Sequence, residues 1–221
     1  MICLGIDTST FAIALGIVRD DQVIYDVYCN TGTPSADRIH TLIGRALKES
    51  ELSLNDIDLF ACSVGPGSFT GLRVGVATIE GLSFPLSRPA YGIPTFDALV
   101  WRFLNLYEQV VPMLDAKRGE IYTAIYKNGK RVFPVKAVDP CDYFNRIEGD
   151  ALFLGDGVKI YMDVILDRIG KKAHFLNPNL DSPRGSDVAY LGILSYRKGK
   201  PADKTIEPIY IHPPRIRKKR S

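Results

Sequence analysis

The sequence of 221 residues predicts an α/β protein made of two similar lobes, and three observations lead to this prediction. β-Rich segments and amphipathic helical segments follow one another in the order βββαβα, and the same order occurs in both halves. The first predicted strand of each half ends in an aspartate, Asp7 or Asp115. The composition, with 46% hydrophobic and 24% charged residues, is that of an ordinary globular protein.

The first half begins with three strand-like segments, at 1–7, 11–18 and 22–29. Because their connections are very short, we expect these strands to pair antiparallel. Apolar residues recur at helical spacing over 35–50, which predicts an amphipathic helix, and Ser35 is a suitable N-cap. The half continues with a strand at 58–64, a helix at 69–84, a strand at 90–93 and a helix from 95 to about 106.

The second half repeats the same order of elements, and its helical segments are short. Asn128-Gly129 is typical of a tight hairpin. The elements expected here are strands at 110–115, 120–127, 131–138, 151–156 and 173–176, with helical segments at 140–147, 157–169 and 186–198. We expect residues 1–108 to form the N-terminal lobe, 109–214 the C-terminal lobe and 215–221 a basic tail.

Two such lobes facing each other describe the actin-like (ASKHA, RNase H-like) architecture, in which the acid that ends the first strand points into a cleft. Asp7, Thr8, Ser9 and Asp115 are therefore candidates for contact with a nucleotide phosphate or its Mg²⁺. The alternative is that residues 7–9 form a tight Asx turn with no ligand. The architecture alone leaves the function open, because many activities share it.

The segment "GPGSFTGLRVG" at 65–75 looks like a phosphate-binding loop but lacks the features of one. It has neither the lysine of a P-loop nor the GxGxxG spacing and early βαβ position of a dinucleotide site. Ser68 or Thr70 is suited to cap the following helix. We therefore interpret the motif loop as a tight connection into a closely packed helix; its residues are Gly65, Pro66, Gly67, Ser68 and Thr70.

The helix predicted at 69–84 contains Gly71, Gly75 and Gly81. Each glycine in a helix interior costs about 1 kcal/mol relative to alanine, so close packing has to compensate. One interpretation is that the helix packs only on its own sheet; the sharper one is that a second chain approaches it closely. The residues assigned to this partner surface are Ile39, Leu42, Ile43, Ala46, Gly71, Arg73, Val74, Gly75 and Thr78.

Several functional classes lack support in the sequence. The four cysteines and three histidines are scattered without metal-ligand spacing, so we expect no protein-built metal site. No serine has a histidine at a spacing that suggests a hydrolytic triad. No apolar run approaches the ~18 residues of a membrane span, and we expect a cytoplasmic location. The net charge of +3 comes from the tail, which either contacts nucleic acid or is a solvated terminus.

Five segments, in this order, resemble the TsaB (also called YeaZ) family: "LGIDTST", "GPGSFTGLRVGVAT", "GIPTFDALV", "LDAKRGEIY" and "GDG". This family is a subunit of the bacterial machinery that makes N6-threonylcarbamoyladenosine on tRNA. The resemblance covers the whole chain and is most specific up to about Tyr126. It implies a non-catalytic subunit that pairs with the catalytic subunit TsaD through helices of the first lobe, is joined by the ATPase TsaE, and forms a homodimer when alone.

The resemblance also bears on the alternatives. TsaD carries metal-binding histidines in an HxxxH where this chain has Thr95 and Leu99, so neither ligand is present. The second lobe of this family is reduced, which agrees with the short helices of the second half here. The resemblance therefore implies ATP or ADP only within the complex, and contact with tRNA that is indirect or through the basic tail. The alternatives are a stand-alone actin-fold ATPase or phosphotransferase that uses Asp7 and Asp115, and a glycoprotease-like metallopeptidase.

Overall fold

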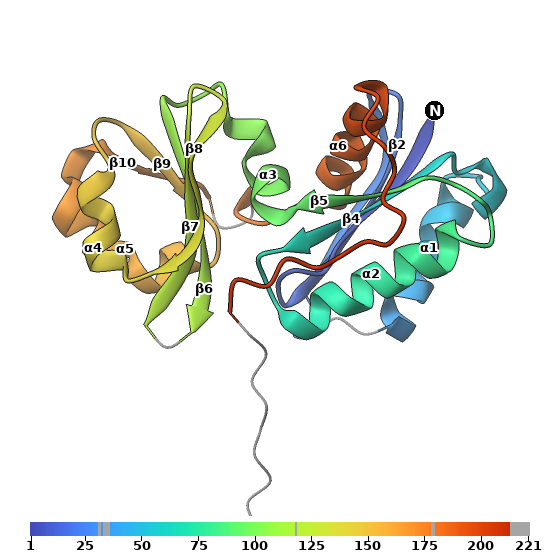
Figure 1. Cartoon of the computed structure of the whole chain (residues 1–221), viewed down its shortest axis with the longest axis horizontal. Coiled ribbons are helices and arrows are strands. Elements are labelled where there is room, and N and C mark those ends of the chain that lie inside the picture. The colour runs from blue at the N-terminus through green and yellow to red at the C-terminus, as the bar shows by residue number, and fades with distance from the viewer. Residues whose placement is uncertain (31, 33–35, 118, 178–179, 213–221) are drawn as a thin grey trace, which may run out of the picture.

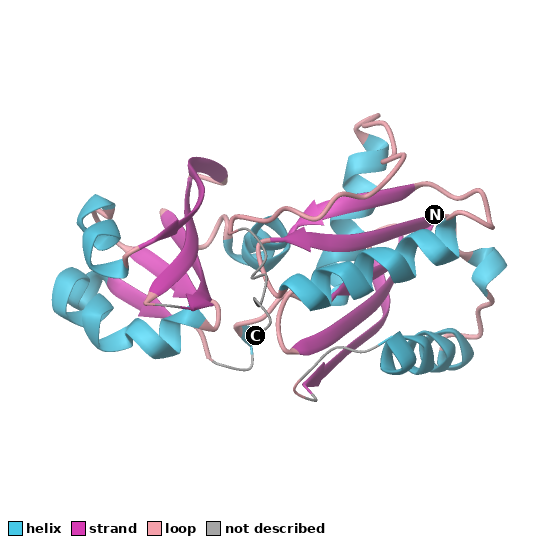
Figure 2. Cartoon of the chain, turned by 60° about the horizontal axis from the view of Figure 1, so that its bottom comes forward, coloured by secondary structure: helices cyan, strands magenta, loops and turns pink. Residues whose placement is uncertain are grey.

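The computed structural model describes residues 1–30, 32, 36–117, 119–177 and 180–212. The proposed N-cap Ser35 and the basic tail 215–221 lie outside these residues. Two five-stranded sheets form the two lobes, as the sequence predicts, and Figure 1 shows them side by side with α3 between them. Figure 2 shows each lobe as a twisted sheet flanked by helices.

The first sheet has the strand order β3-β2-β1-β4-β5, and β1 pairs antiparallel with β2 and parallel with β4. A central strand between an antiparallel hairpin and parallel crossovers is what the order βββαβα produces. The elements of this half are β1 (Ile2–Asp7), β2 (Ala12–Arg19), β3 (Gln22–Asn30), α1 (Ala36–Glu49), β4 (Leu59–Gly65), α2 (Phe69–Ser83), β5 (Ala90–Pro94) and α3 (Thr95–Val100).

The second sheet has the equivalent order β10-β9-β6-β7-β8. Asn128 and Gly129 both have positive φ angles, 48° and 72°, so the predicted tight hairpin between β7 and β8 is confirmed. The elements are β6 (Gln109–Lys117), β7 (Glu120–Lys127), β8 (Lys130–Val138), α4 (Pro140–Tyr143), β9 (Ala151–Leu154), α5 (Gly157–Ile169), β10 (Ala173–Phe175) and α6 (Gly185–Arg197). Short 3₁₀ turns lie at Leu54–Asp56, Trp101–Phe103, Phe144–Arg146 and Gly170–Lys172.

Helices cover both faces of the first sheet. Successive residues of a strand point to opposite faces, so Leu4 packs in the core beneath α1 and α2 while Cys3 packs with Val188 and Ile193 of α6. The sequence-based division is therefore wrong for the end of the chain, because α6 belongs to the first lobe although it follows the second. Glycines make this packing possible: a Cβ on Gly5 would lie 2.3 Å from the Ala189 nitrogen.

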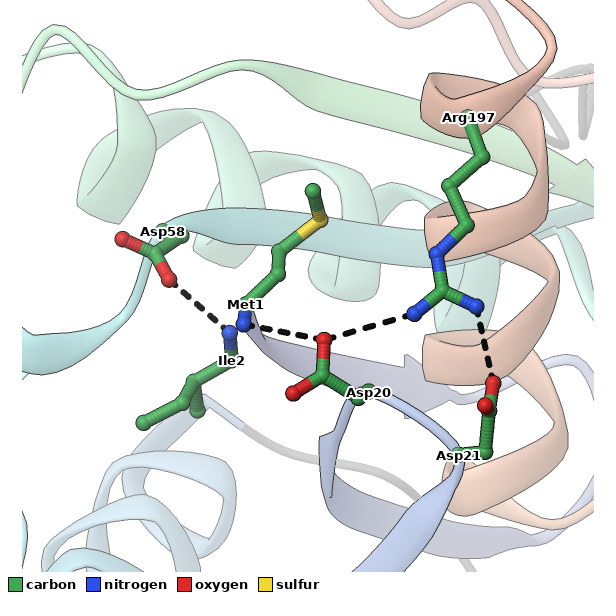
Figure 3. A network of polar contacts seen from close by, with 6 residues as sticks. All are labelled: Met1, Ile2, Asp20, Asp21, Asp58 and Arg197. Atoms are coloured by element: carbon green, nitrogen blue, oxygen red, sulfur yellow. Dashed lines mark hydrogen bonds and ion pairs between the residues drawn. The ribbon is translucent and has the colours of Figure 1, made fainter.

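Ion pairs at the surface hold α6 in the same place (Figure 3). The Arg197 guanidinium reaches Asp21 at 2.8 Å and Asp20 at 3.3 Å, and Asp20 also pairs with the amino group of Met1 at 3.1 Å. The neighbouring amide of Ile2 donates to Asp58 at 2.9 Å. These contacts join the last helix to the start of the chain and to the β2–β3 turn.

Much of the predicted partner surface lies inside the first lobe. Ile39, Ile43 and Ala46 are at most 4% exposed and pack in the lobe's own core, with Leu42 against its edge. The apolar stripe of α1 covers the sheet, as in any amphipathic surface helix, and its opposite face is the one available to a partner. The assignment of Ile39, Ile43 and Ala46 to a partner contact is therefore wrong.

The glycines of α2 also have an internal role. A Cβ on Gly71 would lie 2.0 Å from the carbonyl oxygen of Thr8, and one on Gly75 would lie 2.3 Å from the Thr8 hydroxyl oxygen. Thr78 is buried and bonds the Val74 carbonyl, whereas Arg73 is exposed. Gly71 and Gly75 thus allow the helix to approach the β1–β2 turn of its own lobe, not a second chain.

Candidate functional site: the interlobe cleft

A cleft of about 490 Å³ lies between the lobes; we call it the interlobe cleft. Its walls come from the β1–β2 turn, the motif loop, the end of β6 and a C-terminal segment that returns from α6. The lining residues that carry polar or aromatic groups are Ser9, Thr10, Phe11, Ser68, Phe69, Asp115, Lys117, Tyr122, Asp156, Tyr210 and His212. A cavity of this size, with mixed apolar and polar walls, is typical of small-ligand sites.

Asp7 lies beneath the cleft instead of lining it. Its carboxylate is 1% exposed and accepts hydrogen bonds from the Ser9 hydroxyl at 3.0 Å on each oxygen and from the Ser9 amide at 3.1 Å. Burial raises the pKa of Asp7, and the bonds from Ser9 act in the opposite direction. The amide contact is that of an Asx turn, which is the ligand-free alternative for residues 7–9.

The side chain of Thr8 is hydrogen-bonded to α2. Its hydroxyl donates to the carbonyl oxygen of Gly71 at 2.7 Å, and the residue is 1% exposed. Of the four residues predicted for nucleotide contact, the cleft therefore brings together Ser9 and Asp115, and it excludes Asp7 and Thr8.

Asp115 faces the cleft but is already paired. The ammonium group of Lys117 lies 2.5 Å from one carboxylate oxygen, and the Lys117 amide donates to the other at 2.7 Å. Lys117 has a φ of +65°, which a non-glycine residue adopts at some cost, and its ammonium lies 5.6 Å from the Phe11 ring centroid. The Asp115 carboxylate thus already has a cationic partner within the chain, on a side chain that is itself 63% exposed.

Asp156 completes the acidic wall. It accepts a hydrogen bond from the Asp115 amide at 3.0 Å, and burial is the largest cause that raises its pKa. Neither Lys117 nor Asp156 is among the site residues predicted from the sequence. Lys117 lies between two predicted strands, a position that gives no signal for a site. The signal available at Asp156 is its position at the end of the strand predicted at 151–156, where a second strand of the lobe ends.

The motif loop is closely packed against the β1–β2 turn. The Ser68 amide donates to the Ser9 carbonyl at 2.6 Å, and a Cβ on Gly67 would lie 2.4 Å from that same oxygen. The Ser68 hydroxyl accepts from the Gly71 amide at 3.3 Å, so Ser68 is the N-cap of α2, as predicted. Gly65, with φ of +119°, has Ile209 where a Cβ would be. The glycines thus serve packing.

The C-terminal segment after α6 forms one wall of the cleft. This segment has no regular periodicity, so the sequence pattern does not predict its position. The Ile209 amide donates to the Val64 carbonyl at 2.6 Å, and the Tyr210 ring packs against Phe69 in a tilted arrangement with ring centroids 4.7 Å apart. The His212 ring nitrogen is 3.0 Å from the Glu120 carboxylate, although it is not oriented for a hydrogen bond. The segment thereby reaches from the first lobe to the second.

Thr95 and Leu99 have structural roles. The Thr95 hydroxyl accepts a hydrogen bond from the Gly65 amide at 3.1 Å, and Leu99 is fully buried in a hydrophobic cluster between the lobes. Within the described part of the chain, no group of three or more His, Cys, Asp and Glu side chains is placed to hold a metal ion. None of the described helices combines the length and apolarity needed to cross a bilayer.

The sequence matches the family model described as TsaD, tRNA N6-adenosine threonylcarbamoyltransferase, over residues 32–204. TsaB proteins described as tRNA threonylcarbamoyladenosine biosynthesis proteins are similar along most of their length. The Bacillus subtilis protein is 29% identical over 87% of each chain, and that of Escherichia coli is 27% identical over 94% of this chain and 93% of its own. The chain belongs to the TsaB (YeaZ) branch of this family.

Solved structures agree with this assignment of the fold. YeaZ from Pseudomonas aeruginosa superposes with a TM-score of 0.76 at 23% identity, over 95% of this chain and 99% of that one. Component A of the (R)-2-hydroxyglutaryl-CoA dehydratase of Acidaminococcus fermentans, at 10% identity, has a TM-score of 0.55 over 90% of this chain and 98% of its own. The TsaB-family chain thus shares the duplicated actin-like fold with proteins of unrelated sequence.

Proposed function

We propose that this chain is a non-catalytic, activating subunit of the complex that forms N6-threonylcarbamoyladenosine on tRNA. In this role it pairs with a TsaD catalytic subunit, the ATPase TsaE joins the pair, and the chain forms a homodimer when alone. Membership of the TsaB branch supports the pathway, since the TsaB relatives are described as biosynthesis proteins for this nucleoside. We also place the protein in the cytoplasm.

One observation carries the non-catalytic part of the proposal: both strand-end carboxylates are already occupied by groups of the chain itself. Asp7 is buried under Ser9, and Asp115 is neutralised by Lys117 at 2.5 Å. Binding Mg²⁺-nucleotide through these acids would require breaking a buried turn and an ion pair. ATP or ADP is therefore expected only within the complex, where a partner can supply further contacts.

The outward face of α1 and α2 is the surface that we propose for the TsaD partner. Gly44 and Gly81 are exposed on these helices, and a Cβ on either would meet nothing within 4 Å. Each residue weakens its helix without an internal packing reason, in contrast to Gly71 and Gly75. Small residues on adjacent helices allow the backbone of another helix to approach closely.

Reconstitution tests the proposal. The chain is purified alone and together with its TsaD and TsaE partners, and ATP hydrolysis and threonylcarbamoyladenosine formation on tRNA are measured for each. We expect both activities in the complex, and neither above background for the isolated chain. If the isolated chain hydrolyses ATP substantially and Asp115→Asn abolishes this activity, the chain is instead a stand-alone ATPase. Failure of the three proteins to associate would overturn the subunit role.

A further inference from the structure

A second cleft lies at the other end of β7, beside the β7–β8 hairpin; we call it the hairpin cleft. It has a volume of about 330 Å³ and is bounded by β5, α3 and the end of α6 in the first lobe and by the hairpin in the second. Figure 1 shows α3 between the β7–β8 strands on one side and α6 on the other.

The wall of the hairpin cleft has an apolar part and a polar part of similar extent. The apolar part is formed by Ile93, Val100, Trp101, Leu104, Leu191 and Leu194. Trp101 is partly exposed, and its ring centroid lies 5.7 Å from that of Tyr190, so the indole has an aromatic neighbour within the chain. A supported indole at the wall of an open cleft is suited to stack on another planar group.

The polar groups of the hairpin cleft are predominantly basic. Arg131, Lys198 and Lys200 line it, and the carboxylate among its lining residues is that of Asp97. Asp97 is already engaged, because it accepts a hydrogen bond from the Tyr126 hydroxyl at 2.5 Å and lies 3.9 Å from the Arg131 guanidinium. Neither Lys198 nor Lys200 has an ion-pair partner within the described part of the chain.

We propose that the hairpin cleft binds a single strand of RNA, with a base against Trp101 and backbone phosphates on Lys198, Lys200 and Arg131. A basic rim beside an aromatic face is the combination that single-stranded nucleic acid requires, since cations attract the phosphates and every base can stack. The body of the chain outside its tail is slightly acidic, with 23 basic and 25 acidic side chains, so the three cations of this cleft are a local feature. The inference rests on the proposed function only for the choice of RNA as the polyanion.

The simpler explanation for the lysines is that they complement the partial negative charge at the C-terminal end of α6, where Lys198 is the C-cap. That explanation predicts no ligand and no response of Trp101 to RNA. It accounts for the position of Lys198, but not for the apolar wall or for Arg131, which comes from the other lobe.

Trp101 provides a direct test, because it is the one tryptophan in the sequence. The full-length chain is titrated with a single-stranded RNA oligonucleotide at low and at moderate salt, and the tryptophan fluorescence is followed. We expect saturable quenching whose midpoint rises steeply with salt. The double substitution Lys198→Glu, Lys200→Glu should raise the midpoint by about tenfold or more, because two phosphate contacts become repulsive.

A matched control carries the same change of charge elsewhere. Lys171→Glu with Lys172→Glu alters two adjacent exposed lysines of the second lobe that do not line the cleft, and should leave the midpoint within about twofold. RNA binding seen by anisotropy of a labelled oligonucleotide with no change in fluorescence would overturn the proposal. So would an equal effect of the two double substitutions, or equal quenching by poly-glutamate, which would indicate an acidic protein instead.

The outcome can be separated from that of the proposed function. The Lys198→Glu, Lys200→Glu chain is expected to assemble with its partners and to lower tRNA modification by the complex. If the complex forms and modifies tRNA, but the Trp101 fluorescence of the chain does not change on addition of RNA, then only the proposed RNA site is rejected. Failure of the wild-type proteins to assemble rejects the subunit role and leaves the fluorescence result to stand on its own.

Discussion

The hydroxyl group of Tyr126, in β7 of the second lobe, donates a hydrogen bond of 2.5 Å to the carboxylate of Asp97, in α3 of the first lobe. The Tyr126 side chain is 4% exposed, and burial together with the Asp97 charge raises its pKa above the usual range, which keeps the phenol protonated. The pair joins the two lobes at the hairpin cleft, while His212 and Glu120 approach each other at the far end of β7.

Removing the phenol should loosen this junction. Tyr126→Phe keeps the packed ring but leaves Asp97 with the more distant Arg131, so we expect a loss of about 1 kcal/mol in the free energy of unfolding. The measurement is urea unfolding of the isolated chain. Tyr196→Phe, which removes a phenol from a ring that is 47% exposed, is the control and should change stability by a few tenths of a kcal/mol. Equal effects of the two substitutions would contradict a specific role for the Tyr126–Asp97 bond.

Gly71 and Gly81 lie in the same helix and should respond in opposite ways to alanine. At Gly71 the new Cβ would be 2.0 Å from a backbone oxygen of Thr8, which cannot move without shifting the β1–β2 turn. We expect Gly71→Ala to destabilise the chain by about 1–3 kcal/mol. At Gly81 the space is open, and alanine should stabilise the helix by about 1 kcal/mol.

Thermal unfolding of the two alanine variants checks this prediction. A Gly71→Ala chain as stable as the wild type would mean that α2 does not approach Thr8 as closely as the structure places it. A destabilised Gly81→Ala chain would show that the open space beside Gly81 is occupied in the isolated protein.

Asp181 should make stability fall as the pH rises from about 4 to about 7. Burial raises its pKa to about 6, against the opposing effects of the Gly155 amide, which donates to it, and of Lys159. Since the folded chain holds this proton more tightly than the unfolded chain, the contribution to stability is full below the unfolded pKa. It is lost as the pH passes through about 6.

The variant Asp181→Asn isolates this contribution, because the amide oxygen still accepts from Gly155 and cannot ionise. Relative to the wild type, its stability should rise by about 2 kcal/mol between pH 4 and pH 8. Urea midpoints at several pH values give the difference. Asp167→Asn, at a side chain that is 83% exposed, is the control; a parallel shift in both variants would argue against a buried Asp181.

The sequence predicts the individual strands and helices of this fold better than it predicts which of them pack against one another. Period-2 and period-3.6 patterns placed the strands and helices, and Asn128-Gly129 identified the hairpin, because these signals depend on nearby residues alone. The apolar stripe of α1 predicts that Ile39 and Ile43 are buried, but it does not predict which surface buries them. In the structure they pack on the sheet of their own lobe. A stripe records a buried face and carries no information about which surface covers it.

The sequence pattern does not predict the position of α6 in the fold, for a related reason. The helix follows the second lobe along the chain, and only the glycines in mid-strand at Gly5 and Gly16 hinted that another backbone lies against the first sheet. In the same way, Asp7 has the residue type and strand-end position of a ligand-binding acid. Its three hydrogen bonds from Ser9 depend on the conformation of the turn, which residue type does not specify.

The partner surface can be tested at Gly81, where the effects on folding and on association should have opposite signs. Gly81→Leu adds a side chain to an exposed helix position with open space around it, so the isolated chain should be at least as stable as the wild type. The same side chain would keep a partner helix from approaching the backbone. We therefore expect association with TsaD, and self-association of the chain alone, to weaken by about tenfold or more.

Sedimentation of the isolated chain and titration with TsaD measure the two associations, and thermal unfolding measures the fold. Met162→Leu, at an exposed position on α5 in the other lobe, adds no bulk near α1 or α2 and should leave all three unchanged. If Gly81→Leu and Gly44→Leu both fold and associate as the wild type does, then the outward face of these helices is not the interface. The two glycines would then have neither an internal nor an external packing role, and the TsaD contact would have to lie on another part of the chain.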